Sequence, residues 1–269
     1  MTGGLLLLAL VLAAAAPPPV PGDTPPPTMR CFIAAYPETV CGGSADALAL
    51  CDGARIPWDD GRDKSDFDTL LNAPDLQDTV SMRYRPGRDY ASPPPLNFEP
   101  GRIRYVPFFE ALYGATRAEV KAKLAPVRWL LASGGKVVQM TRVNGVAAAL
   151  QRVSDDIERE LPRELRELAA KCSGTFVWRE IHGTGRRSMH SFGVAIDVGV
   201  ARSDYWDWTR PDKDGRYRYR NRFPLEVVEI FERHGFVWGG KWYHFDTMHF
   251  EYRPELLTPP CVDTPVTTP

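Results

Sequence analysis

Apolar residues in the C-terminal third of the chain recur with the two-residue period of a β-strand. Between residues 193 and 200 every second residue is a branched apolar one, and small residues or Asp197 lie between them. This alternation predicts a strand with one apolar face, from whose other face Asp197 projects. Residues 249–252 predict a second strand, on which His249 and Glu251 share one face. Two polar faces that carry potential ligands are therefore expected within this part of the fold.

Upstream, apolar positions recur every three or four residues and predict helices. Residues 116–119, Thr-Arg-Ala-Glu, have the pattern of a capping box and predict a helix that Pro126 interrupts. Residues 135–143 predict a strand, and apolar stripes along 146–161 and 224–235 predict two helices that pack inward. Helices followed by a small, mostly antiparallel sheet indicate an α+β fold, and the apolar stripes are interpreted as core.

The N-terminal part differs in composition from the rest of the chain. Residues 3–16 form an apolar run that ends in alanines, which is typical of a signal peptide or an N-terminal anchor, although no Lys or Arg precedes it. The run is too short for a comfortable membrane span. We therefore predict a signal peptide or anchor at residues 1–16 and a Pro-rich linker at 17–28. An irregular Cys- and Pro-rich region packed on the core follows at 29–100, then the catalytic domain at 101–258 and a tail at 259–269.

Five cysteines fit an exported protein, periplasmic or extracellular, because an oxidising compartment lets them pair. Two disulfides are expected, and a bond between Cys172 and Cys261 is one candidate. Spacings of ten residues between the first three cysteines do not match a zinc-thiolate site. The formal net charge of −1 gives no indication of nucleic-acid or membrane binding, and a monomer is expected.

Two histidines and an aspartate form the strongest chemical pattern in the chain. His190 and Asp197 lie seven residues apart, and His249 follows about fifty residues later. Each residue alone is more commonly structural, but together they match a catalytic zinc site, which has three protein ligands and an open position for water. Gly193 would allow the intervening turn to bring His190 to the side of Asp197. We therefore predict zinc bound by His190, Asp197 and His249.

A zinc-bound water also needs a general base and a cation near the developing oxyanion. Asp246, three residues before His249, is the candidate base, which would pass the proton to the leaving amine. Arg179, within residues 175–181 that resemble a strand, is the candidate cation. Arg186 and Arg187 are weaker alternatives for that role.

These residues resemble a known family. The motifs are Ser188-x-His190-x-x-Gly193-x-Ala195-x-Asp197, Trp238-Gly-Gly-x-Trp242 and Asp246-x-x-His249-Phe-Glu251. They are similar to those of the zinc D-alanyl-D-alanine carboxypeptidases, a family that also includes phage-endolysin L-alanyl-D-glutamate peptidases. The resemblance implies zinc on the predicted triad, Asp246 as the acid/base and bacterial cell-wall peptides as the substrate. An Asp at the base position is more similar to the endolysin branch.

The same motifs give four candidate substrate-binding residues, which are Ser188, Trp242, His244 and Glu251. A further segment, Arg216–Arg222, has an Arg at every second position, so that an extended chain would place the arginines on one side. It is interpreted either as a substrate-binding flap or as a solvated hairpin. Two functions follow: a zinc peptidase of peptidoglycan stem peptides, or a non-catalytic zinc-containing module of the same fold that binds them. Asp246 and Arg179 favour the enzyme, because a binding module needs no proton shuttle.

Overall fold

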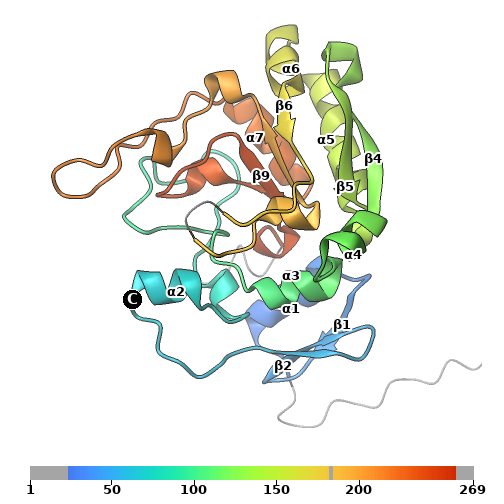
Figure 1. Ribbon diagram of the computed structural model, residues 1–269, viewed down its shortest axis with the longest axis vertical. Coiled ribbons are helices and arrows are strands. Elements are labelled where there is room, and N and C mark those ends of the chain that lie inside the picture. Colours follow the sequence, from blue (N-terminus) through green and yellow to red (C-terminus); the bar gives the residue numbers. More distant parts are fainter. Residues whose placement is uncertain (1–23, 182–183, 259–269) are drawn as a thin grey trace, which may run out of the picture.

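The computed structural model describes residues 24–181 and 184–258, where helices and short antiparallel strands follow one another along the chain (Figure 1). The helices are α1 Pro27–Ala35, α2 Phe67–Asn72, α3 Val106–Tyr113, α4 Arg117–Ala122, α5 Val146–Glu160, α6 Arg163–Ala170 and α7 Leu225–Arg233. The strands are β1 Val40–Gly43, β2 Ala47–Leu50, β3 Arg55–Pro57, β4 Leu124–Trp129, β5 Lys136–Thr141, β6 Cys172–Gly174, β7 Ala195–Val198, β8 Phe236–Trp238 and β9 His249–Tyr252. The predicted α+β class is confirmed.

Some predictions fall on residues that the structure does not describe. The signal peptide or anchor, most of the linker and the tail, including Cys261, lie outside the described residues. None of the helices in the described part has the length and apolar character that a membrane crossing requires.

A four-stranded antiparallel sheet in the order β6-β7-β9-β8 forms the centre of the C-terminal part. Its two faces differ in chemistry. Ile196 of β7 pairs with Phe250 of β9, and on that face Phe250 stacks on Phe231 of α7 with ring centroids 3.9 Å apart. Neighbouring residues of a strand point to opposite faces, so Asp197 and His249 lie on the other face. The sheet thus buries one apolar face against α7 and presents the predicted metal ligands on the other.

The predicted helices and the 135–143 strand are confirmed in α5, α7 and β5, and two details differ from expectation. The helix that starts after Thr116 already ends at Ala122, and Pro126 lies within β4, a strand of a two-stranded sheet in which a missing N–H is tolerated. Residues 175–181 do not form the predicted strand. Their backbone makes only scattered hydrogen bonds to residues 186–190, because the chain there turns into a short 3-10 helix at Met189–Phe192.

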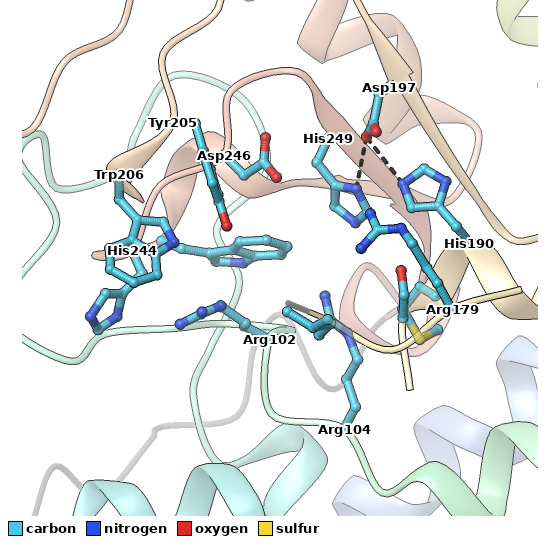
Figure 2. Close-up of a pocket in the computed structure, with 14 residues that line it drawn as sticks. Arg102, Arg104, Arg179, His190, Asp197, Tyr205, Trp206, His244, Asp246 and His249 are labelled. Atoms are coloured by element: carbon cyan, nitrogen blue, oxygen red, sulfur yellow. Dashed lines mark hydrogen bonds and ion pairs between the residues drawn. The ribbon is translucent and has the colours of Figure 1, made fainter. Parts of the chain in front are cut away.

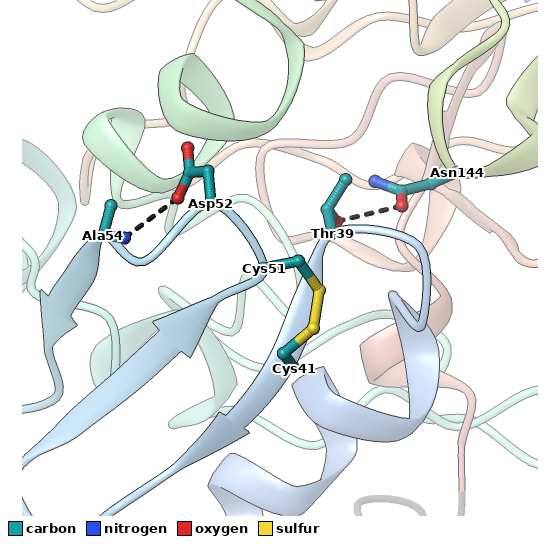
Figure 3. Close-up of a disulfide and its surroundings, with 6 residues drawn as sticks. All are labelled: Thr39, Cys41, Cys51, Asp52, Ala54 and Asn144. Atoms are coloured by element: carbon teal, nitrogen blue, oxygen red, sulfur yellow. Dashed lines mark hydrogen bonds between the residues drawn. A yellow bond between two sulfur atoms is a disulfide. The ribbon is translucent and has the colours of Figure 1, made fainter. Parts of the chain in front are cut away.

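The region predicted as irregular, residues 29–100, contains most of α1, the whole of α2 and a three-stranded antiparallel sheet, β1-β2-β3. A disulfide between Cys41 and Cys51 closes the hairpin of β1 and β2 (Figure 3). Beside it, the Thr39 hydroxyl donates a hydrogen bond to the Asn144 side chain at 3.0 Å, just before α5. The hairpin is therefore attached to the folded domain. Cys31 is also disulfide-bonded.

The expected bond between Cys172 and Cys261 is wrong. Cys172 is a free thiol, buried at the start of β6, and burial raises its pKa. A core position in a sheet strand explains why this cysteine behaves as a small apolar residue.

Gly193 has a backbone that only glycine adopts without strain. Its φ is +67°, and a Cβ atom there would lie 2.8 Å from the Leu124 side chain and 3.1 Å from the Thr141 backbone nitrogen. We expect Gly193→Ala to lower the free energy of unfolding by about 1–3 kcal/mol, as urea denaturation would measure. Gly53→Ala is the matched control, since Gly53 has φ +92° but open space around it. Equal losses in the two variants would show that the contacts around Gly193 do not matter.

Candidate active site

The three predicted metal ligands lie together on the polar face of the C-terminal sheet. Asp197 on β7 is directly opposite His249 on β9 in the strand register. His190 comes from the 3-10 helix before β7, and the turn at Gly193 brings it back toward Asp197. One possible ligand atom from each residue lies within 4.8 Å of the others. Figure 2 shows both imidazoles pointing toward the Asp197 carboxylate.

Hydrogen bonds fix the orientation of both imidazole rings. The Nδ1 of His190 lies 2.7 Å from the Thr175 carbonyl oxygen, and the Nε2 of His249 lies 3.0 Å from the Glu251 carboxylate. The remaining ring nitrogens, Nε2 of His190 and Nδ1 of His249, lie 3.2 and 3.0 Å from Oδ1 of Asp197. Metal-binding histidines commonly donate their second N–H to a carbonyl or carboxylate. The arrangement therefore fits two nitrogen donors and one oxygen donor that face a metal ion.

The charges around His249 also suit a cation. Its ring lies between two carboxylates, those of Asp197 and Glu251. Burial alone would lower the pKa of His249, but the two carboxylates raise it to about 10. Burial likewise opposes ionisation of Asp197, and the charges and hydrogen bonds of His190 and His249 hold its pKa well below its usual range. The two carboxylates thus favour positive charge at this position, whether as a proton on His249 or as a metal ion.

Asp246 also lines this cleft. Its Oδ1 atom is buried and makes no hydrogen bond to the described residues. Burial raises the pKa of Asp246 to about 6; the charge of His249 opposes this shift, and the negative charge of Asp197 adds to it. In Figure 2 the carboxylate lies between Tyr205 and His249. A carboxylate in a cleft, with one buried oxygen and a raised pKa, has the properties of a general base.

The cleft contains most of the other predicted site residues. Its lining includes Arg179, Ser188, Trp242 and His244. The indole of Trp242 is nearly buried; it donates a hydrogen bond to the Pro100 carbonyl at 2.7 Å and its ring packs beside His249. The Nδ1 of His244 is hydrogen-bonded to the Glu99 carboxylate, and its ring contacts that of Trp206. Arg179 points toward the two imidazoles, and its guanidinium is hydrogen-bonded only to a carbonyl oxygen of the described residues, that of Glu180 (Figure 2).

Glu251, predicted as a substrate-binding residue, lies outside the cleft lining. Its side chain is fully buried and does not line the cleft. Besides His249 it pairs with Arg104 and Arg253. The residue follows His249 by two positions on β9, so the strand places it behind the imidazole. Its hydrogen bond to Nε2 of His249 fixes the orientation of that ring.

The alternative cations lie farther from the triad. Arg187 stacks over the Trp178 ring at 4.2 Å, and Arg186 borders a smaller cavity next to the cleft. Neither lines the cleft itself, which leaves Arg179 as the cation of the three that faces the ligands.

Sequence reasoning missed Arg102 and Arg104, which form part of the cleft wall. They come from the segment before α3, within a part of the chain that carries no recognised motif. Arg104 pairs with Glu251, and its guanidinium lies 5.5 Å from the Trp242 ring centroid. In the sequence, Arg102 and Arg104 alternate with Gly101 and Ile103, which suggests that both arginines lie on one side of an extended segment. Only the long-range packing of this segment shows that this side faces the cleft.

The arginine-rich segment, Arg216–Arg222, has the predicted two-sided character. Its arginines are exposed, whereas Tyr217 and Tyr219 are partly buried. The Tyr217 ring packs on Trp206 and His244 at the edge of the cleft, and the Tyr219 hydroxyl donates to the Gly240 carbonyl. Arg222 pairs with Asp204. The tyrosines thus support the cleft wall, while the arginines face solvent.

Comparisons with known proteins agree with the motifs. Residues 182–252 match a sequence model described as D-alanyl-D-alanine carboxypeptidase. Over 77 residues the chain is 38% identical to the peptidoglycan L-alanyl-D-glutamate endopeptidase CwlK of Bacillus subtilis (strain 168), which covers 27% of this chain and 44% of that protein. The chain thus matches less than half the length of this relative. No solved structure matches the chain. Since His190, Asp197, Asp246 and His249 lie within the matched segment, the predicted resemblance to the D-alanyl-D-alanine carboxypeptidase and L-alanyl-D-glutamate endopeptidase family is confirmed for residues 182–252.

Proposed function

We propose that the protein is a zinc-dependent peptidase that hydrolyses peptide bonds in the stem peptides of bacterial peptidoglycan. One observation supports the proposal: two imidazoles and a carboxylate that could hold a metal ion converge in a cleft beside Asp246, whose buried Oδ1 makes no hydrogen bond to the described residues. The similarity of residues 182–252 to peptidases of this substrate supports it. Such a substrate lies outside the cytoplasm, so the proposal includes export of the protein.

Zinc would be held by His190, Asp197 and His249, a donor set that is typical of zinc sites with an open position. When bound, it would polarise the scissile carbonyl and lower the pKa of a water molecule. Neighbouring residues fix the orientation of the two imidazole rings. Thr175 and Glu251 accept hydrogen bonds from the outward ring nitrogens of His190 and His249, and such partners raise the basicity of metal ligands.

Two further side chains carry the proposed chemistry. Asp246 takes the proton from the attacking water and donates it to the leaving amine, and its raised pKa of about 6 suits both steps near neutral pH. Arg179 faces the imidazoles and has no carboxylate partner among the described residues, so its charge is available to stabilise the developing oxyanion.

A non-catalytic binding module explains these features less well. A module that only holds a peptide gains nothing from burying Oδ1 of Asp246 without a hydrogen-bond partner among the described residues, because such an atom is costly to desolvate. In an enzyme, a bound water molecule and the scissile peptide would supply the hydrogen bonds that this Asp246 oxygen lacks.

Incubation with muropeptides tests the activity directly. We expect the purified zinc-loaded protein to shorten them, with loss of one D-alanine for a carboxypeptidase or separation of L-alanine from D-glutamate for the endolysin-type cleavage. Mass spectrometry of the products distinguishes the two. A chelator should abolish turnover and added zinc should restore it, because the triad supplies the proposed metal site. Equal turnover with and without the chelator would contradict zinc dependence.

A further inference from the structure

The part of the chain outside the segment that matches known peptidases contributes a group of arginines to the cleft. Arg102 and Arg104, before α3, lie at the junction of the cleft with the smaller cavity beside it. Arg186 borders that smaller cavity as well. Three guanidiniums from two distant parts of the chain thus meet at one end of the candidate active site. In Figure 2, Arg102 and Arg104 lie across the cleft from Asp246 and His249.

The carboxylates near these arginines already have other partners. Glu99 pairs with Arg102 at 3.2 Å but also with His244. Glu251, the partner of Arg104, also accepts hydrogen bonds from Arg253 and His249. Glu251 is thus shared among three partners. Glu99 uses Oε1 for both of its contacts, and its Oε2 makes no hydrogen bond to the described residues, those of Arg186 included.

Arg186 is the guanidinium that lacks a counter-ion. It makes no ion pair with any described residue, and its Nε is buried without a hydrogen-bonding partner. Burial and the nearby Arg102 and Arg104 lower the pKa of Arg186 to about 10, and only Glu99 opposes this effect. A half-buried guanidinium among like charges is unfavourable unless an anion completes the site.

We propose that Arg102, Arg104 and Arg186 form a carboxylate-binding subsite at one end of the cleft. A guanidinium binds a carboxylate through two parallel hydrogen bonds, and Arg186 has donors to spare. The inference rests on the proposed peptidase function, because it names the group that positions a stem peptide in the cleft. That group is either the C-terminal carboxylate or the α-carboxylate of the D-glutamate residue, since both have the same chemistry.

Binding to a protein that does not turn over tests the subsite separately from catalysis. The protein is zinc-loaded, full-length and carries Asp246→Asn. The probes are the peptide L-Ala-γ-D-Glu-L-Lys-D-Ala-D-Ala, its C-terminal carboxamide and its D-isoglutamine analogue, each titrated in a calorimeter. We expect one of the two amides to bind at least about tenfold more weakly than the free acid. The amide that loses affinity identifies which carboxylate the subsite holds.

Arg186→Gln in the same background should remove this preference, so that acid and amide bind alike. Its melting temperature should not fall, because the substitution removes a half-buried charge without an ion pair. The control is Arg117→Gln, which deletes an exposed arginine on α4 and should keep the preference.

Each result decides between the two proposals. If the acid and both amides bind equally, or if Arg186→Gln keeps the preference, or if no peptide binds, the subsite is excluded. Cleavage of muropeptides by the unsubstituted protein would then still support the peptidase. Conversely, a carboxylate preference that Arg186→Gln abolishes establishes the subsite even if the unsubstituted protein cleaves nothing, in which case the proposed function fails.

Discussion

Asp246→Asn should lower kcat on muropeptides by about 10²–10⁴-fold while zinc stays bound, the range that loss of a general acid/base typically costs. The reason lies in the position of the carboxylate, which is buried in the cleft and outside the three-ligand set. Asparagine keeps the shape of the side chain but cannot accept the proton from water. Steady-state kinetics with metal analysis of the same sample would measure both quantities.

The matched control for this substitution is Asp207→Asn, which removes an exposed carboxylate close in sequence to the cleft residues Tyr205 and Trp206. It should leave kcat within about twofold of the original, as expected for a surface position away from the chemistry. If Asp246→Asn retained full activity, another group would have to act as the base, and the proposed mechanism would be wrong.

His249→Ala should abolish zinc retention and with it turnover. Loss of partners that merely orient a ligand already weakens metal binding 10–100-fold, so loss of the ligand itself should exceed about 100-fold. The same change also leaves Asp197 and Glu251 without the imidazole between them. Equilibrium dialysis followed by elemental analysis would measure the zinc bound per chain.

His234→Ala is the appropriate comparison, because this histidine ends α7 and contacts Asp156 of α5 at 2.7 Å, away from the cleft. It should keep one zinc per chain even if the protein becomes less stable. Full zinc occupancy in His249→Ala would remove this residue from the ligand set, and loss of zinc in both variants would mean that unfolding, not ligand removal, explains the result.

The cluster of His190, Asp197 and His249 could be predicted from sequence because it depends on local periodicity. Strand alternation placed Asp197 and His249 on polar faces, and the register between β7 and β9 then set them opposite each other. The role of Glu251 could not be obtained in this way. Alternation puts it on the same face as His249, but only the contacts with Arg104 and Arg253 show that this position is covered.

Long-range contacts also explain the remaining errors. Residues 175–181 have the composition of a strand but lack a continuous partner, because residues 189–192 coil into a 3-10 helix. Cys172 seemed available for a disulfide, yet its place in β6 buries it. Arg102 and Arg104 line the cleft because the segment before α3 packs against the C-terminal sheet. This segment has no recognisable motif, and local sequence patterns do not predict such long-range packing.

The contacts of Glu251 have a consequence for how the chain can evolve. One carboxylate links a ligand of the proposed metal site to Arg104, which comes from the other half of the chain. A substitution at either position changes the charge that the other must balance, so residues 104 and 251 should vary together among descendants of this gene. A domain exchange that replaced only residues 182–252 would separate this pair, and the transplanted site would inherit an unmatched carboxylate behind its histidine.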